Sequence, residues 1–240
     1  MLQSQNFSHL TPIIAIDGHA GAGKSTVADL VAHHLGFWHV NTGLYYRALT
    51  WLAFEQGLDP QNQEALDALA QTADIEVHEH DGIQDVYVNQ QNVSAFLRTP
   101  AINRSISLIS SYAGVRSAIT NRLQHLQHPH GIIMDGRDIG TVVFPQANLK
   151  IFLTASVKER ARRQHEEAIA KGQTISLAEL QESISLRDQQ DSEREVAPLK
   201  QAVDAVCIDS TGKYPQDIAN LILTLWQEKA ATLELSPNKA

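Results

Sequence analysis

The stretch Ile13-Ile14-Ala15-Ile16-Asp17-Gly18-His19-Ala20-Gly21-Ala22-Gly23-Lys24-Ser25-Thr26 decides the fold of this chain of 240 residues. It contains the pattern G-x-x-x-x-G-K-[ST] of a phosphate-binding loop, which is informative only between a strand and a helix. Residues 13–16 are apolar and rich in β-branched side chains, which predicts a strand that is buried on both faces. Apolar residues at helical spacing follow the loop, and Gly36 is placed to end that helix.

The residue types of the loop suit the binding of a polyphosphate. Glycines let the backbone approach an anion closely, and the N–H groups at the start of the following helix point toward it. The lysine supplies a mobile cation for the β- and γ-phosphates, and the serine hydroxyl can bind Mg²⁺. An ordinary glycine-rich turn is the alternative interpretation. We predict a nucleotide site formed by Gly18, His19, Ala20, Gly21, Ala22, Gly23, Lys24, Ser25 and Thr26.

Composition and charge exclude several classes of protein. The formal net charge of −8 argues against a general binder of nucleic acid or of anionic membranes. A single cysteine excludes an internal disulfide, which fits a reducing compartment. No apolar run is long enough to span a bilayer, and residues 1–12 lack the features of a signal peptide. We therefore expect a cytoplasmic globular protein, and we expect it to act as a monomer.

Strands alternate with helices along most of the chain, which predicts an open parallel sheet with helices on both faces. Residues 75–88 differ, because their alternating pattern around a turn at 81–82 predicts an antiparallel hairpin in an inserted subdomain. Two capping boxes are expected, Ser156 with Glu159 and Ser176 with Glu179. Residues 205–208 predict a last buried strand, in which Cys207 is expected to be a small core residue.

Charged residues gather where the predicted strands end. Asp135 follows an apolar strand, like the acidic residue that helps to hold Mg²⁺ opposite a phosphate loop. It could instead be a turn aspartate before a glycine. Several arginines lie at helix starts, in the loop after this strand or beside Asp191, and arginine binds phosphate oxygens through its planar fork. This second group of cations predicts a second anion beside the nucleotide, and its members are Arg47, Arg116, Arg137, Arg187 and Arg194.

With these residues assembled, the chain resembles the bacterial-type cytidylate kinases of the nucleoside monophosphate kinase superfamily. The resemblance extends from residue 11 to residue 226. The blocks that begin at Asp135 and Arg187 are specific to that family, whereas the phosphate loop is shared with many ATPases. The matching blocks are IDGHAGAGKST (16–26), TGLYYR (42–47), DGRDIGTVVF (135–144), KIFL (150–153), RDQQDSEREVAPL (187–199) and DST (209–211).

The resemblance implies a P-loop kinase fold, in which a five-stranded parallel sheet carries an antiparallel β/α insert for the monophosphate and a short lid. A flexible arm (1–12) would precede a single kinase domain (13–228), and a tail (229–240) would follow it. Within the domain the core would comprise residues 13–59, 117–186 and 201–228. The insert would span about 60–116, and the lid about 187–200.

The resemblance also implies the activity and the roles of single residues. The family transfers the γ-phosphoryl group of ATP to CMP or dCMP with Mg²⁺, which here would bind Ser25 and Asp135. Ser107, Arg116 and Asp138 would recognise cytosine, and Arg187 with Asp191 the ribose. The positions that match the family's monophosphate site are Thr42, Tyr46, Arg47, Ser107, Arg116, Arg137, Asp138, Arg187, Asp191 and Arg194.

We expect a direct in-line transfer without a covalent enzyme intermediate, in which Lys24, Arg137, Arg187 and Arg194 stabilise the developing charge. Another small phosphotransferase, such as a UMP or shikimate-type kinase, is the alternative among enzymes. A nucleotide-driven switch or a DNA-associated ATPase is the alternative from another class. A GTP switch would need a guanine-reading N-K-x-D, which the chain lacks. A DNA-bound motor would need a basic face, which the net charge does not suggest.

Overall fold

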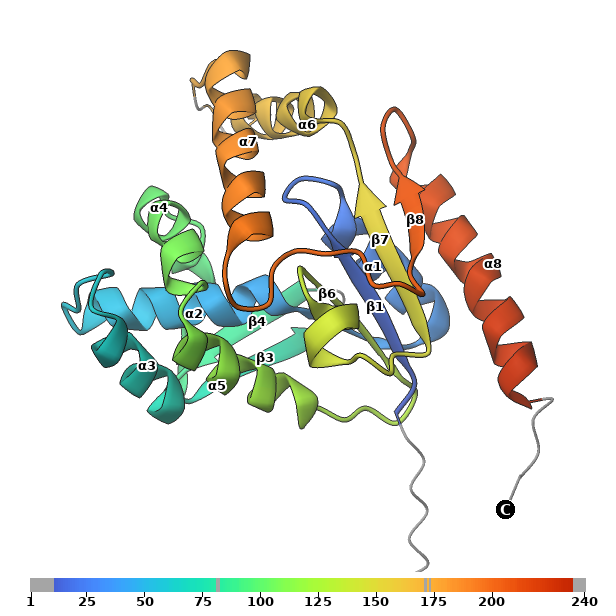
Figure 1. Cartoon of the computed structure of the whole chain (residues 1–240), viewed down its shortest axis with the longest axis horizontal. Helices are drawn as coiled ribbons and strands as arrows, with labels where there is room; N and C mark the ends of the chain where they lie inside the picture. The colour runs from blue at the N-terminus through green and yellow to red at the C-terminus, as the bar shows by residue number, and fades with distance from the viewer. Residues whose placement is uncertain (1–10, 81–82, 171, 173, 235–240) are drawn as a thin grey trace, which may run out of the picture.

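A five-stranded parallel sheet lies at the centre of the molecule (Figure 1). The structure is a computed structural model and describes residues 11–80, 83–170, 172 and 174–234. The strands stand in the order β2 (Trp38–Asn41), β6 (Ile132–Gly136), β1 (Ile13–Gly18), β7 (Leu149–Thr154) and β8 (Val206–Asp209), each parallel to its neighbours. The predicted fold class is thereby confirmed.

Helices cover both faces of this sheet because successive side chains of each strand point to opposite sides. Ile14 and Ile16 of β1 face a core shared with α1 (Lys24–Leu35) and α8 (Pro215–Glu234). Ala15, between them, faces the other core, which includes residues of α2 (Thr42–Glu55) and α5 (Ala113–Gln124). The helix after the phosphate loop ends at Gly36, as predicted, with the glycine in the left-handed conformation at φ 67°.

A second, antiparallel sheet lies under α2, as the alternating pattern of residues 75–88 predicts. In β3 (Ile75–His80) and β4 (Ile83–Val88), Ile75 pairs with Val88 and Val77 with Val86. The predicted turn at 81–82 lies outside the described residues. The other elements of this region are α3 (Gln63–Thr72), β5 (Gln91–Asn92), the short 3-10 helix η1 (Ser94–Phe96) and α4 (Pro100–Ile109).

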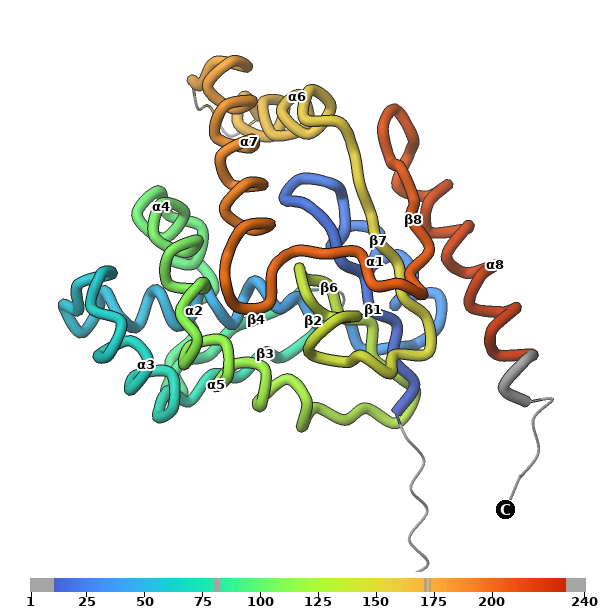
Figure 2. The backbone as a smooth tube through the Cα atoms, viewed as in Figure 1, coloured from blue at the N-terminus to red at the C-terminus, as the bar shows by residue number. Residues whose placement is uncertain are grey.

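Two further helices, α6 (Val157–Ala170) and α7 (Leu177–Glu193), pack against each other beyond the carboxyl end of the sheet. Figure 2 shows the segment after α7 crossing from the end of that helix to the start of β8. The capping box of Ser176 and Glu179 is confirmed, with both of its hydrogen bonds present. Only half of the other box forms, because the Glu159 carboxylate bonds Arg162 and Arg163 instead of the Ser156 N–H.

The sequence-based interpretation was wrong for the last strand. Strand β8 lies at the edge of the sheet, so that Val206 and Cys207 are exposed. Residues 187–193 of the predicted lid form the last turns of α7. Most of the predicted arm (1–10) and part of the tail (235–240) lie outside the described residues. None of the described helices combines the length and the apolar character needed to cross a membrane.

Candidate active site

The phosphate loop joins β1 to α1 at the carboxyl end of the sheet, where ligands of open α/β folds gather. A side chain at Gly18 is excluded, because a Cβ there would lie 1.9 Å from the carbonyl oxygen of Leu153 and φ is 147°. Lys24 is only 6% exposed, and its Nζ donates to the His19 carbonyl at 2.8 Å. Burial, followed by the charge of Arg137, lowers the pKa of Lys24 to about 7. An anion in this loop would reverse that shift.

Ser25 and Asp135, the two predicted ligands of Mg²⁺, are in direct contact. The Ser25 hydroxyl donates to Asp135 Oδ2 at 2.9 Å and accepts a hydrogen bond from Asn41 Nδ2 at 3.0 Å. The other carboxylate oxygen, Asp135 Oδ1, lies 2.8 Å from His39 Nε2. Burial acts to raise the pKa of Asp135, but His39, Lys24 and Ser25 outweigh it and hold that pKa below its usual value.

Asp17, at the end of β1, holds the turn that follows β6. Its two carboxylate oxygens each accept a backbone hydrogen bond at 2.7 Å, from Ile139 and from Gly140. These residues begin a single π-helical turn, η2 (Ile139–Val143), directly after Asp138. Burial raises the pKa of Asp17 to about 6, although the two backbone donors oppose that shift. Asp17 therefore positions the loop that carries Arg137 and Asp138.

Three of the predicted arginines surround the end of the phosphate loop and influence one another. Burial and the charge of Arg187 lower the pKa of Arg47 to about 10. Burial and the charge of Arg137 likewise lower the pKa of Arg187. Of these three arginines, only Arg137 has a carboxylate partner within the described part of the chain, where its Nε donates to Asp191 Oδ2 at 2.8 Å. A bound anion would stabilise like charges that are gathered and partly buried in this way.

A second polar group lies further from the phosphate loop. Arg116 and Asp138, 3% and 4% exposed, form an ion pair at 2.5 Å. The Arg116 guanidinium carbon also lies 5.3 Å from the centre of the Tyr46 ring, within range of a cation–π interaction. Burial acts to lower the pKa of Arg116, but Tyr46 and Asp138 together raise it. The Arg194 side chain completes the group, 3.8 Å from Asp138.

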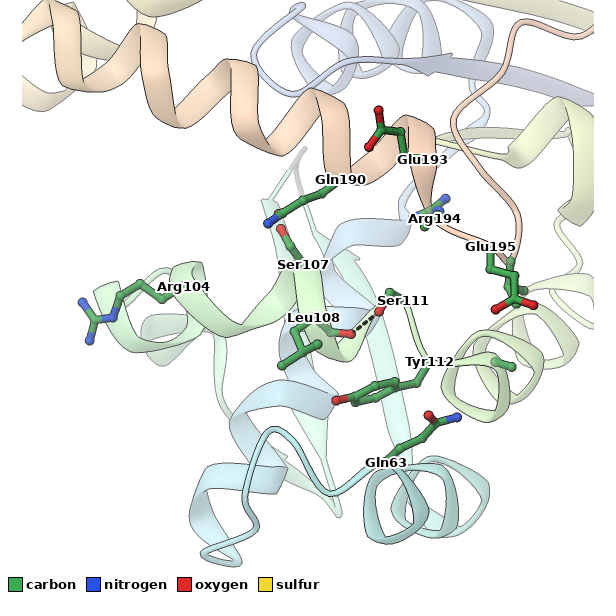
Figure 3. Close-up of a pocket in the computed structure, with 12 residues that line it drawn as sticks. Gln63, Arg104, Ser107, Leu108, Ser111, Tyr112, Gln190, Glu193, Arg194 and Glu195 are labelled. Atoms are coloured by element: carbon green, nitrogen blue, oxygen red, sulfur yellow. Dashed lines mark hydrogen bonds between the residues drawn. The ribbon is translucent and has the colours of Figure 1, made fainter.

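A cavity of about 540 Å³ opens between α4 and the end of α7. Ser107, one of the residues expected to recognise the base, lines it together with Arg194. Figure 3 shows Ser107 on α4 and Gln190 on α7 on facing sides of this space, with their side chains pointing toward each other. The cavity therefore lies between the predicted insert and the predicted lid, beside the Arg116–Asp138 pair.

Some predicted residues are engaged inside the protein. The Thr42 hydroxyl donates to the backbone carbonyl of Asp135 at 2.8 Å, so it holds the strand end in place. Arg47 donates to the Leu97 carbonyl and to Asn103 Oδ1, at 2.8 and 2.6 Å. His19 meets Phe152 edge-on with ring centres 6.0 Å apart, and Thr26 lies on the exposed side of α1. The roles of these residues toward a ligand stay predictions.

Sequence reasoning missed several members of the site. His39 and Asn41 belong to β2. The signal that could have identified His39 was the presence of a histidine in a short buried strand beside the strand of Asp135. Asp17 was treated only as the end of a strand. For Arg160 the sequence suggested contact with the nucleotide or pairing with Glu159, Glu166 and Glu167. Its guanidinium bonds the Ala20 carbonyl at 3.1 Å and Asp188 at 2.9 and 2.5 Å, so it connects the phosphate loop to α7.

Comparison with known proteins identifies the family. The family model described as cytidylate kinase matches residues 14–228. The chain belongs to the cytidylate kinase family. A cytidylate kinase from Bacillus licheniformis is 45% identical over 218 residues, which cover 90% of this chain and 96% of that protein. Another from Exiguobacterium sibiricum is 48% identical over 198 residues, which cover 82% of this chain and 89% of that protein.

Family membership makes the chain an ATP-dependent nucleotide kinase. The kinase needs two anion sites in one cleft, one for the phosphates of ATP and one for the acceptor. The prediction that Lys24 in the loop and the arginines beside it form two anion sites would meet that need. The match runs through both groups and through the segment between them.

Proposed function

We propose that this ATP-dependent kinase transfers the γ-phosphoryl group of ATP to CMP or dCMP, giving ADP and CDP or dCDP, by direct in-line displacement. One observation carries the assignment of the acceptor site. Among the described residues, Arg116 Nε, Arg187 Nε and Arg194 Nη2 are buried without a hydrogen-bond partner. Buried donors without partners are rare, and a bound anionic nucleotide would supply acceptors for them.

The acceptor phosphate needs no general base in this reaction. Its second pKa is about 6, so at neutral pH it is already largely the dianion that attacks the γ-phosphorus. The bond from the γ-phosphorus to the bridging oxygen of ADP breaks as the new bond forms, and ADP leaves with the electron pair. Arg47, Arg137, Arg187 and Arg194 hold the acceptor phosphate and the moving charge. The protein contributes positioning and charge stabilisation.

Lys24 binds the phosphates of ATP in the proposed reaction. In the ligand-free protein its ammonium group donates to the His19 carbonyl. Phosphate oxygens are stronger acceptors for a charged donor than a neutral carbonyl is. Lys24 therefore exchanges this contact for the β- and γ-phosphates and regains full protonation as it does so.

The residues present fit a magnesium ion. Mg²⁺ prefers oxygen ligands and keeps several waters when it is bound by one or two protein groups and the substrate phosphates. Ser25 Oγ and the Asp135 carboxylate are such oxygens, side by side at the start of α1. When bound there, the ion would act as a Lewis acid that neutralises charge on the β- and γ-phosphate oxygens. Ser25 and Asp135 would hold it, directly or through water.

The base is recognised by Asp138, Arg116 and Ser107. The Asp138 carboxylate accepts from the exocyclic amino group of cytosine, and Arg116 donates to the acceptors on the ring. Uracil would place a carbonyl oxygen against the carboxylate, which leaves a buried mismatch. The ribose lies between the base and the phosphate, where Arg187 and Asp191 can reach its hydroxyl groups.

Further proposals concern domains, assembly and place of action. We assign residues 60–116 to binding of the monophosphate, and residues 187–200 to a lid that closes over both substrates. Every proposed site residue comes from one chain, so a monomer suffices, and light scattering of the purified protein would test this. We place the enzyme in the cytoplasm, where its ATP is supplied and where a single cysteine stays reduced.

An acceptor panel tests the proposed activity. ADP production is measured with CMP, dCMP, UMP, AMP and shikimate offered separately at saturating ATP and Mg²⁺, and the products are identified by mass spectrometry. We expect rapid turnover with CMP and dCMP, and none of it when EDTA removes the metal. Equal kcat/KM for CMP and UMP would overturn the assignment of the base site. A phosphorylated protein side chain on the pathway would overturn the direct mechanism.

A further inference from the structure

His39 connects three parts of the protein that the reaction needs together. It lies in β2, at the outer edge of the parallel sheet, and it is 3% exposed. Its backbone N–H donates to Glu79 Oε2 at 3.3 Å, and its carbonyl accepts from Gln84 Nε2 at 3.0 Å. Both partners belong to the β3–β4 hairpin. The side chain points the other way, to Asp135 at the carboxyl end of β6.

The geometry determines which ring nitrogen carries the proton. Asp135 Oδ1 lies 2.8 Å from His39 Nε2, and an ionised carboxylate only accepts hydrogen bonds. Nε2 must therefore be the donor in this contact. The other nitrogen, Nδ1, faces the half-exposed Asp29 carboxylate at 3.9 Å, beyond hydrogen-bond distance. A neutral imidazole with its proton on Nε2 satisfies the contact with Asp135.

The contact orients the groups that face the proposed metal. With Oδ1 held by His39, the opposite oxygen Oδ2 accepts the proton of Ser25 Oγ. The same hydroxyl accepts from Asn41 Nδ2, which leaves one of its two lone pairs free. Without the donor at Oδ1, the carboxylate could turn about its own bond. The direction of the free lone pair on Ser25 would then no longer be set.

We propose that His39 is a positioning residue for the divalent ion: its Nε2–H fixes the Asp135 carboxylate, which in turn orients the Ser25 hydroxyl. This inference rests on the proposed function, because it assumes that Ser25 and Asp135 hold the metal of ATP. His39 itself touches neither substrate nor metal. Outer partners of this kind typically contribute about 10- to 100-fold to metal affinity.

A matched pair of substitutions separates the hydrogen bond from the volume of the side chain. His39→Gln keeps an N–H donor at a similar reach, and His39→Met fills a similar space without one. Gln84→Leu serves as the control, because it removes the hairpin's bond to the His39 carbonyl and leaves the imidazole in place. Thermal unfolding of each variant shows that it is folded before its metal binding is measured.

The decisive readout is binding of Mn²⁺ in the presence of ADP, followed by the electron paramagnetic resonance signal of free Mn²⁺. We expect His39→Met to weaken Mn²⁺ binding about 10-fold or more. His39→Gln should recover most of this loss, and Gln84→Leu should stay within about twofold of the wild type. In turnover, His39→Met should raise the Mg²⁺ concentration for half-maximal rate by a similar factor, with the KM for CMP little changed.

Three results would overturn the inference. These are wild-type Mn²⁺ affinity in His39→Met, no recovery in His39→Gln, and an equal loss in Gln84→Leu, which would assign the effect to the anchoring of the hairpin. Failure of the proposed function is distinguishable from all three. In that case the wild-type enzyme itself would show no transfer to CMP or no need for a divalent ion.

Discussion

The Arg194 guanidinium lies 3.8 Å from the carboxylate of Asp138, although Arg194 follows the last residue of α7 and Asp138 follows β6. The contact brings the proposed lid to the proposed base site without any ligand. It is too long for a hydrogen bond, and Arg194 Nη2 has no hydrogen-bond partner among the described residues. Arg194 is instead held by its Nε, which donates to the Ala197 carbonyl at 2.7 Å. Arg194 therefore lies near the proposed base site with an N–H group that is available to donate a hydrogen bond to a substrate.

Replacing Arg194 tests whether its guanidinium group stabilises the phosphoryl group during transfer. An arginine that reaches such a group is worth roughly 10³-fold or more in related chemistry. We expect Arg194→Ala to lower kcat by at least about 10²-fold, while the Kd for CMP without ATP changes much less. Steady-state kinetics and calorimetry measure the two quantities. A loss of CMP affinity as large as the loss of turnover would contradict this role.

Closure of the lid is a separate prediction. Residues 188–195 carry several charges, and two bound nucleotides would bring negative charge that Arg194 and Arg187 can bridge. Amide hydrogen exchange across this segment should slow when ATP analogue and CMP are both present, and much less with either alone. Full protection in the free enzyme would show that the end of α7 is already rigid without substrates and does not act as a closing lid.

Specificity for cytosine should depend on Asp138. In a buried site built for hydrogen bonding, a mismatched partner can cost up to about 10⁴-fold, so CMP and dCMP should far exceed UMP in kcat/KM. Asp138→Asn offers an N–H group to the uracil carbonyl, so the ratio of CMP to UMP should fall at least about 10-fold. Glu193→Gln, in the lining of the cavity between α4 and the end of α7, is the control and should keep the ratio. An unchanged ratio in Asp138→Asn would remove Asp138 from the base site.

Nucleotide binding should change the protonation of Lys24. Its pKa of about 7 in the free protein means that most of the amine is neutral at pH 8. Phosphate oxygens favour the charged form and raise that pKa, so binding of ADP at pH 8 should take up as much as about one proton. Calorimetry in buffers of different ionisation enthalpy measures the uptake, which should shrink at pH 6 and be lost in Lys24→Met. That variant should also lose at least about 10²-fold in kcat while staying folded.

Stability should depend on pH through Asp17. Its pKa is raised from 3.8 to about 6, so between these values the folded protein binds more protons than the unfolded chain. The contribution of this group to the free energy of unfolding is therefore present at low pH and is lost as pH rises through about 6. The difference in stability between the wild type and Asp17→Asn should fall by up to about 3 kcal/mol from pH 4 to pH 7. Urea unfolding at both values measures it, with Asp59→Asn as the surface control.

The sequence by itself determined the parts of this protein whose cause is local. The phosphate loop could be identified because glycine, lysine and serine are needed at defined positions between a buried strand and a helix. The alternation of residues 75–88 indicated a hairpin, and the residues after the strands indicated where ligands gather. Each of these depends on neighbours in the chain, so the pattern of residues was sufficient.

Only the tertiary structure decided which of these residues meet. Strand order places β2 beside β6, and this register brings His39 and Asn41 to Asp135 and Ser25 across long stretches of chain. The same order leaves β8 at an edge, where Val206 and Cys207 are exposed although Ile208 is buried. Burial and the proximity of charges, which set the pKa values of Asp17 and Lys24, likewise exist only once distant segments pack together.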